Sequence, residues 1–132
     1  MNGITSDAGQ LRKHSVRIMG SRVALINWQK ITGSMKALER DLNNDSGDFV
    51  HNIAMTHAIF EKIHPFSDGN GRTGRLLMLA QALKLGYVPP LVLKERRHAY
   101  YKYLETAQTT ENYLPLEKFI AESILSSSKI LR

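Results

Sequence analysis

A run of twelve residues, 64–75, constrains the fold of this chain more than any other segment. It reads His-Pro-Phe-Ser-Asp-Gly-Asn-Gly-Arg-Thr-Gly-Arg. Pro65 disfavours helical angles in the residue before it, so a preceding helix must end at His64. The glycines allow backbone angles that are closed to bulkier residues, and a leucine-rich stretch follows directly from Leu76. The run therefore predicts a helix, a tight glycine-rich loop and a second helix in succession.

Most of the remaining chain is also predicted to be helical. Asp48 can cap a helix that carries apolar residues on one face as far as Ile63. The leucine-rich segment 76–85 is apolar almost all the way round, which predicts a central, buried helix ended by Gly86. Further helices are expected from Thr32 or Ser34 to about Leu42, near 94–108 and near 115–130.

The segment 15–26 has a different pattern from the rest. Apolar and polar residues alternate on both sides of Gly20 and Ser21, which predicts a two-stranded hairpin with its turn at these two residues. We therefore expect an all-α fold: a compact helical domain with one small β-hairpin. At 132 residues the chain is long enough to bury a core, and we expect residues 1–132 to form a single domain.

The composition limits the compartment and the partners of the protein. The chain has no cysteine, no apolar run of membrane-spanning length and no signal-peptide centre in its first 20 residues, so we expect a cytoplasmic protein without membrane contacts. The net charge is +6, but the basic residues are scattered apart from the cluster 94–98, and no aromatic residues interleave with them. We therefore expect no nucleic-acid partner. A polyphosphate ligand would equally favour local positive charge.

The twelve-residue run also carries the groups needed to hold a polyphosphate. The N–H groups at a helix N-terminus behind a glycine-rich turn attract anions. Arg72 and Arg75 are three residues apart, so both project from one side of the first helical turn and can clamp phosphates. Asp68 is a hard oxygen ligand suited to Mg²⁺, with a helix or turn cap as its alternative role.

His64 lies at the mouth of this loop. Its imidazole is mostly neutral at pH 7, as a general base must be, although a histidine at a helix C-terminus can also simply stabilise the helix dipole. Phe66 is expected to turn inward, and His57 is expected to be a hydrogen-bonded core residue. The combination indicates nucleophilic displacement at phosphorus.

The run resembles the signature of the Fic domain, His-Pro-Phe-x-(Asp or Glu)-Gly-Asn-Gly-Arg-x-x-Arg, and matches it at every specified position. The similarity covers about residues 9–108. Four other segments look like the core of that family: Gly9 to Arg12, the hairpin, the run with Ala54, His57 and Phe60, and the run Arg97-x-x-Tyr-Tyr. The hairpin resembles the family's flap, which binds an extended segment of a target protein by strand addition.

The resemblance implies a protein adenylyltransferase, an enzyme that moves AMP from ATP to a Ser, Thr or Tyr hydroxyl of a target protein and releases pyrophosphate. It assigns His64 as the base and Asp68 as the ligand of Mg²⁺ between the α- and β-phosphates. It assigns phosphate contacts to five residues: Gly69, Asn70 and Gly71 at the α-phosphate, Arg72 at the β-phosphate and Arg75 at the γ-phosphate. Tyr100 and Tyr101 would be walls of the adenine pocket. ATP is then the substrate and Mg²⁺ the cofactor.

Many Fic proteins carry an inhibitory helix with the pattern (Ser or Thr)-x-x-x-Glu-(Gly or Asn). No glutamate in this sequence has Ser or Thr four residues upstream, and the nearest approach, Thr106 with Glu111, is one residue too long. We therefore expect the inhibitory helix to be missing or to be supplied by a separate protein. Arg75 is then expected to be unobstructed and the isolated domain to be active, with self-modification. Assembly into a homo-oligomer, as in some relatives, stays open.

Two alternatives stand beside AMP transfer. One is removal of AMP by the same site (deAMPylation), and the other is a non-catalytic module that binds a nucleotide or peptide in a toxin–antitoxin-like pair. An intact His64 and Asp68 favour an enzyme, since a pure binding module needs no base. DNA binding ranks below both of these, because no recognition helix can be identified.

Overall fold

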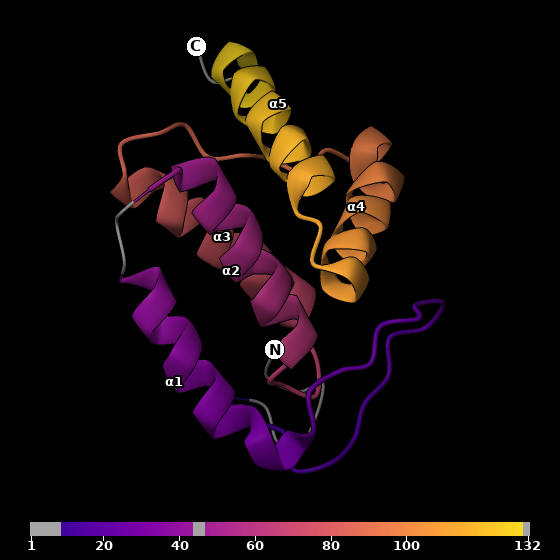
Figure 1. Ribbon diagram of the computed structural model, residues 1–132. Helices are drawn as coiled ribbons and strands as arrows, with labels where there is room; N and C mark the ends of the chain where they lie inside the picture. The colour runs from indigo at the N-terminus through magenta and orange to yellow at the C-terminus, as the bar shows by residue number, and fades with distance from the viewer. Residues whose placement is uncertain (1–8, 44–46, 131–132) are drawn as a thin grey trace.

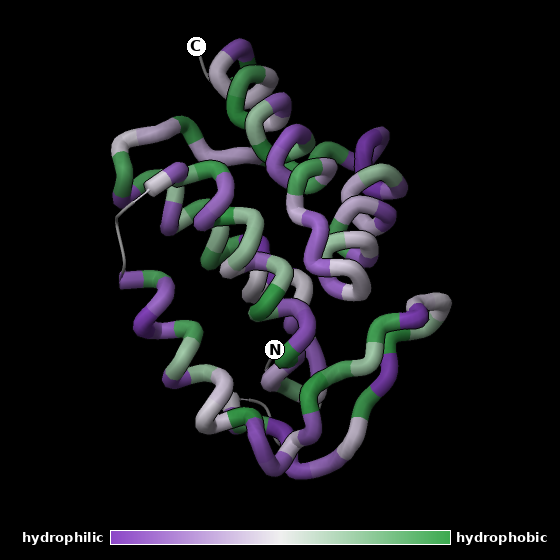
Figure 2. The backbone as a smooth tube through the Cα atoms, in the orientation of Figure 1, coloured by the Kyte–Doolittle hydropathy of each residue, from purple (hydrophilic) through white to green (hydrophobic). Residues whose placement is uncertain are grey.

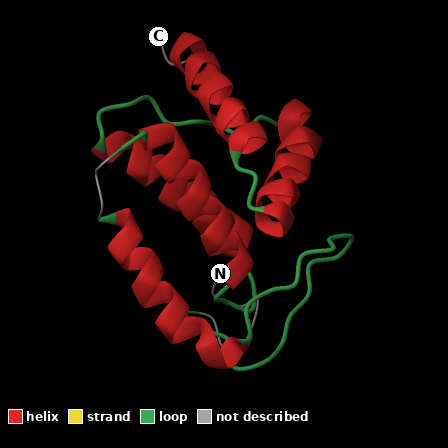
Figure 3. Ribbon diagram, in the orientation of Figure 1, coloured by secondary structure: helices red, strands yellow, loops and turns green. Residues whose placement is uncertain are grey.

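The computed structural model describes residues 9–43 and 47–130. Within these ranges the chain consists of helices and loops, and no strand is present (Figures 1 and 3). The α-helices are α1 (Ile31–Leu42), α2 (Phe49–Ile63), α3 (Asn70–Lys84), α4 (Arg97–Thr110) and α5 (Leu114–Ile130), and short 3-10 helices, Trp28–Lys30 and Lys94–Arg96, precede α1 and α4. No helix in the described part of the chain has the length and apolar character needed to cross a membrane.

Helix α2 is the centre of the molecule, because α1, α3, α4 and α5 all pack against it (Figure 1). Two groups of buried apolar side chains form the core. The larger group joins α2 to α3, α4 and α5 and includes Ile53, Met78, Tyr100, Leu116 and Ile120. The smaller group joins α1 to the C-terminal half of α2 and consists of Ile31, Leu38, Phe60 and Ile63. Hydrophobic and hydrophilic residues recur along each helix in Figure 2, as expected for helices with one buried face.

Both predicted ends of α2 are confirmed. The Asp48 carboxylate accepts hydrogen bonds from the backbone N–H groups of Val50 (2.9 Å) and His51 (3.4 Å) at the start of the helix. At the other end, Ile63 is the last helical residue, and His64 takes left-handed backbone angles, φ 48° and ψ 62°. These angles place His64 at the junction between α2 and the glycine-rich loop.

Helix α3 ends as predicted but is not buried all round. Gly86 follows its C-terminus with φ 83°, the left-handed angle that favours glycine after a helix. The expectation of a fully buried helix is wrong, since Leu76 is 64% exposed and Leu83 is 60% exposed. Among the helices, α3 packs mainly on α2. Its buried face is therefore limited to the side that carries Met78 and Ala82.

Helix α1 begins before either predicted cap. It starts at Ile31 and follows directly on a 3-10 turn, so neither Thr32 nor Ser34 lies at the N-cap. Asn27 caps this turn, because its side-chain oxygen accepts a hydrogen bond from the Gln29 N–H (2.9 Å).

The predicted β-hairpin at 15–26 is wrong, because the segment is a loop without strands (Figure 3). The turn itself is present, since the Ser21 N–H donates to the Ile18 carbonyl (3.1 Å). The Ser21 hydroxyl then accepts from the Val23 N–H (3.1 Å), a local bond that competes with a strand ladder. The two arms enclose a hollow of about 490 Å³ instead of pairing, and a hairpin without a sheet to pack on is marginally stable. We refer to residues 12–26 as the N-terminal loop.

Candidate active site

A hollow of about 530 Å³, the main pocket, lies between the tip of the N-terminal loop, the C-terminal end of α2, the start of α3 and one face of α4. Its lining residues are Ile18, Met19, Gly20, Ser21, Glu61, His64, Gly71, Tyr101, Leu104, Glu105 and Gln108. The pocket thus brings together the predicted base, one predicted phosphate-binding glycine and one predicted adenine-pocket tyrosine. Its volume lies within the range of small-molecule sites.

His64 is held by one ring nitrogen. Its Nδ1 lies 3.3 Å from the Glu61 carbonyl oxygen, and because a carbonyl can only accept, Nδ1 carries the proton and Nε2 keeps a lone pair. Burial is the main cause that lowers the pKa of His64; the bond to Glu61 opposes this shift, and the nearby charge of Arg12 adds to it. His64 is therefore neutral at pH 7 and presents an acceptor nitrogen, which is the state that a general base needs.

The N-terminus of α3 is open to an anion. The N-cap residue is Gly69, which has φ 79° and no side chain to cap the helix, so the N–H groups of the first turn are directed into the loop. The buried Asn70 side chain fixes the shape of this loop. Its Oδ1 accepts from the Phe66 N–H (2.9 Å), and its Nδ2 donates to the Phe66 carbonyl (2.7 Å). Phe66 packs against the smaller core group, as expected.

The two arginines of the run occupy different environments. Arg75 is half-buried, and its guanidinium lies against the first turn of α3, where a Cβ atom on Gly71 would be 3.1 Å from its Nη1. A glycine at position 71 therefore leaves room for this guanidinium. The Arg72 side chain is 59% exposed and lies 3.9 Å from the Asp68 carboxylate in a loose ion pair. Asp68 does not cap α3, since the N-cap is Gly69 and no side-chain cap bond is present.

A cluster of buried polar side chains, His57, Glu61 and Tyr100, lies close enough to Arg75 to feel its charge. His57 Nδ1 donates to the Gly74 carbonyl (3.2 Å), and His57 Nε2 accepts from the Tyr100 hydroxyl (2.6 Å). This confirms His57 as a hydrogen-bonded core residue, and its burial lowers its pKa to about 4. Glu61 is 5% exposed, and its Oε1 has no hydrogen-bond partner within the part of the chain that the structure describes. Burial raises the pKa of Glu61 to about 7, although the charge of Arg75 acts in the opposite direction.

The two tyrosines predicted for the adenine pocket are separated in the structure. Tyr101 is 50% exposed and lines the main pocket, whereas Tyr100 is fully buried and bonds to His57. The sequence analysis missed Glu105 and Gln108, which line the same pocket. The signal was the helical period, since Glu105 and Gln108 follow Tyr101 by four and seven residues and so share its face of α4.

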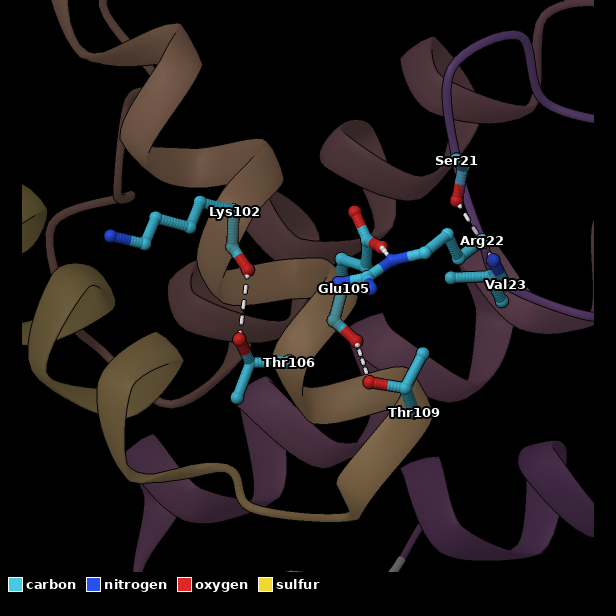
Figure 4. A network of polar contacts seen from close by, with 7 residues as sticks. All are labelled: Ser21, Arg22, Val23, Lys102, Glu105, Thr106 and Thr109. Carbon is cyan, nitrogen blue, oxygen red and sulfur yellow. Dashed lines mark hydrogen bonds and ion pairs between the residues drawn. The ribbon is translucent and has the colours of Figure 1, made fainter.

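An ion pair joins the tip of the N-terminal loop to α4 beside the main pocket. Arg22 Nε lies 3.2 Å from Glu105 Oε1, and Figure 4 shows the arginine reaching across from the loop to the helix. Next to it, the Thr106 and Thr109 hydroxyls donate to carbonyls of their own helix (Figure 4). The Arg22 side chain is 92% exposed, so this contact is weak and can open. We refer to it as the loop latch.

Comparison with known proteins supports the resemblance. The model of the Fic/DOC family matches residues 1–82. Proteins named protein adenylyltransferase Fic from Culex quinquefasciatus and Aedes aegypti are each 42% identical to the chain over 91 residues, and one from Drosophila yakuba is 38% identical. The aligned region is 67% of this chain and 18% of each relative, so the chain spans less than a fifth of the length of these relatives.

Solved structures lead to the same conclusion. Fic-1 from C. elegans (residues 134–508 of that protein) matches with a TM-score of 0.80 at 27% identity, over 95% of this chain and 37% of the solved chain. BepC from Bartonella tribocorum, solved with bound AMPPNP, matches with a TM-score of 0.66 at 22% identity, over 81% of this chain and 54% of that protein, and this likeness concerns the fold alone. From these matches and from the signature at 64–75, the chain belongs to the Fic/DOC family.

Proposed function

We propose that this domain is a protein adenylyltransferase that transfers AMP from ATP to a Ser, Thr or Tyr hydroxyl of a target protein and releases pyrophosphate. One observation carries the proposal: His64, neutral and with its Nε2 lone pair available, lies in the same pocket as the uncapped start of α3. The names of the insect relatives support the same activity.

The proposed position of ATP follows from the chemistry of the pocket walls. Its phosphates would lie against the first turn of α3, where the N–H groups and the partial positive charge of the helix favour anions. The half-buried Arg75, beside Gly71, and the exposed Arg72 would bind the outer phosphates. The adenosine would extend towards α4, where Tyr101 offers a ring face and Gln108 an amide.

The reaction we propose begins at His64. The target hydroxyl would donate its proton to His64 Nε2 while its oxygen attacks the α-phosphorus of ATP. A new oxygen–phosphorus bond forms, the bond from the α-phosphorus to the bridging oxygen breaks, and pyrophosphate leaves with that oxygen. The hydrogen bond from His64 Nδ1 to the Glu61 carbonyl would hold the ring and stabilise the charged imidazolium that results.

We propose Asp68 as the protein ligand of Mg²⁺. Its carboxylate is 41% exposed at the mouth of the loop, and its contact with Arg72 is long, at 3.9 Å, so it can accept a cation. A single carboxylate also suits Mg²⁺, which usually completes its coordination with water and substrate phosphate oxygens. When bound, the ion would neutralise charge on the departing pyrophosphate.

The partners of the domain are a further part of the proposal. The target protein would meet the N-terminal loop at its tip, where Met19 is 96% exposed and also lines the main pocket. An apolar side chain in this position can contact a target next to the reacting groups. A separate inhibitory protein or helix would act at Arg75, the residue proposed to bind the γ-phosphate.

The test is label transfer from ATP that carries the label on either the α- or the γ-phosphate, with Mg²⁺ and with an extract of the host cell. Protein labelled from the α-position alone, and only while Mg²⁺ is present, supports AMP transfer. Label from the γ-position alone would mean phosphate transfer. No label from either form, together with tight ATP binding, would favour the non-catalytic module.

A further inference from the structure

Arg12 is a buried cation at the neck of the N-terminal loop. It is 2% exposed and forms no ion pair with any described residue. Its guanidinium donates to four carbonyl oxygens instead: those of His64 (2.7 Å), Ile63 (3.1 Å), His14 (2.8 Å) and Ile26 (2.6 Å). One side chain therefore joins both ends of the loop to the end of α2.

Two backbone bonds complete this junction. The Arg12 N–H donates to the Pro65 carbonyl (2.8 Å), and the Ile26 N–H donates to the Lys62 carbonyl (3.1 Å). The last carbonyls of a helix lack partners within the helix. Here the carbonyls of Lys62 and Ile63, and those of the next two residues of the chain, are all bonded by the two ends of the loop. The negative end of the α2 dipole also favours a cation at this place.

We propose that Arg12 is a positioning residue that fixes His64 and the N-terminal loop to each other as one unit. The proposal rests on the function proposed for His64 as the base. A target hydroxyl held by the loop would then reach the imidazole at a set distance, because both are anchored to the same guanidinium. Arg12 has no contact with the reacting atoms in this account, and it positions His64 and the loop through the backbone of its neighbours.

The charge of Arg12 has a second effect on His64. A positive charge bonded to the His64 carbonyl disfavours a second positive charge on the ring, so Arg12 also helps to keep the imidazole neutral. The other titratable groups of the main pocket are Glu61, Tyr101 and Glu105, and a substitution at Arg12 leaves these side chains in place. Substitutions at Arg12 can therefore separate its effect on the position of the loop from the effect of its charge on His64.

The experiment compares Arg12→Lys with Arg12→Gln in the full chain without nucleotide. Lysine keeps the charge but cannot reach four carbonyls with a planar fork, whereas glutamine loses both the charge and the fork. The two readouts are the pKa of the His64 ring by NMR titration and the hydrogen-exchange rates of amides 14–26. The matched control is Lys13→Gln, which removes a neighbouring charge from an exposed side chain.

We expect amides 14–26 to exchange on the order of tenfold faster in both Arg12 variants, because both variants lose guanidinium hydrogen bonds that anchor the ends of the loop. The His64 pKa should rise in Arg12→Gln, stay low in Arg12→Lys and be unchanged in Lys13→Gln. Unchanged hydrogen-exchange rates of amides 14–26 in Arg12→Lys would overturn the proposal. If Arg12→Gln does not fold, the Arg12→Lys variant is sufficient for this test. Both readouts are independent of turnover, so a wild-type protein without AMP transfer would count against the proposed function only.

Discussion

Burial shifts the pKa values of two residues of the main pocket, Glu61 and His64, in opposite directions. Burial disfavours the charged form of each group, so it lowers the pKa of His64 and raises that of Glu61 to about 7. At neutral pH the histidine is uncharged, and the carboxyl is close to half protonated. A base and a proton-carrying acid in one pocket are typical of sites that move protons.

We expect Glu61→Gln to change how the stability of the protein depends on pH. Because the pKa of Glu61 is raised from 4.5 to about 7 in the folded protein, its contribution is fully present below pH 4.5 and is lost as pH rises through about 7. Glutamine stays neutral throughout. The variant should therefore gain free energy of unfolding relative to wild type as pH rises from about 5 to about 8, by up to about 3 kcal/mol.

Urea unfolding at the two pH values measures this change. Glu95→Gln, at an exposed glutamate in the short helix before α4, is the matched control and should keep the wild-type dependence on pH. A constant difference between Glu61→Gln and wild type at both pH values would show that the Glu61 carboxyl does not titrate in this range.

At the scale of the elements, the contact between α2 and α3 depends on Gly74. A Cβ atom at this position would lie 1.9 Å from Glu61 Oε1 and 3.1 Å from Phe60 Cδ1. The absence of a side chain therefore lets the two helices approach closely enough for the Gly74 carbonyl to bond His57. This contact holds the start of α3 against the end of α2, where His64 lies.

We expect Gly74→Ala to destabilise the protein by about 1–3 kcal/mol, because the added methyl group must displace Glu61 or separate the helices. Gly33→Ala in α1 is the matched control, since a Cβ there would meet nothing within 4 Å. This control should raise stability by about 0.5–1 kcal/mol, the helix propensity of alanine over glycine. Thermal unfolding of both variants gives the comparison, and a loss of stability in both would contradict this explanation.

The loop latch should affect the exit of nucleotide more than its chemistry. Arg22→Ala removes the 3.2 Å contact with Glu105, and an exposed ion pair contributes at most about 1 kcal/mol. We therefore expect a fluorescent ATP analogue to dissociate up to about fivefold faster, as measured by stopped flow. Arg17→Ala, at an exposed arginine on the other arm of the loop, should leave the rate unchanged. Equal effects of the two variants would mean that charge alone, and not the latch, sets the rate.

Local sequence signals predicted the helices that surround the site, whereas tertiary contacts determine the conformation of the N-terminal loop and the buried cluster around Glu61. Asp48, Pro65 and Gly86 act on neighbouring backbone groups, so the ends of α2 and α3 could be placed from the sequence. The N-terminal loop has the alternation of strands, but its ends are held by bonds to α2 that no local pattern contains. The cluster of Glu61 with Gly74 likewise depends on the distance between two helices.

At the scale of the whole molecule, α2 organises the proposed chemistry. It contacts α1, α3, α4 and α5, it ends at His64, and its last turn anchors the N-terminal loop through Arg12. The proposed base, the start of α3 and the loop proposed to meet a target are thus all anchored to one central, largely buried helix. Rigid support of this kind favours reactions in which positioning supplies much of the rate.

The most direct test of this account is the pH dependence of single-turnover AMP transfer by wild type, His64→Ala and His98→Ala. Because His64 must be neutral and its pKa is lowered from 6.5, the wild-type rate should reach half its maximum below pH 6.5. His64→Ala should lose about 100-fold or more of the rate, and His98→Ala, at an exposed histidine of α4, should lose none. A wild-type midpoint above pH 6.5, or a His64→Ala variant that keeps the wild-type rate, would contradict His64 as the base.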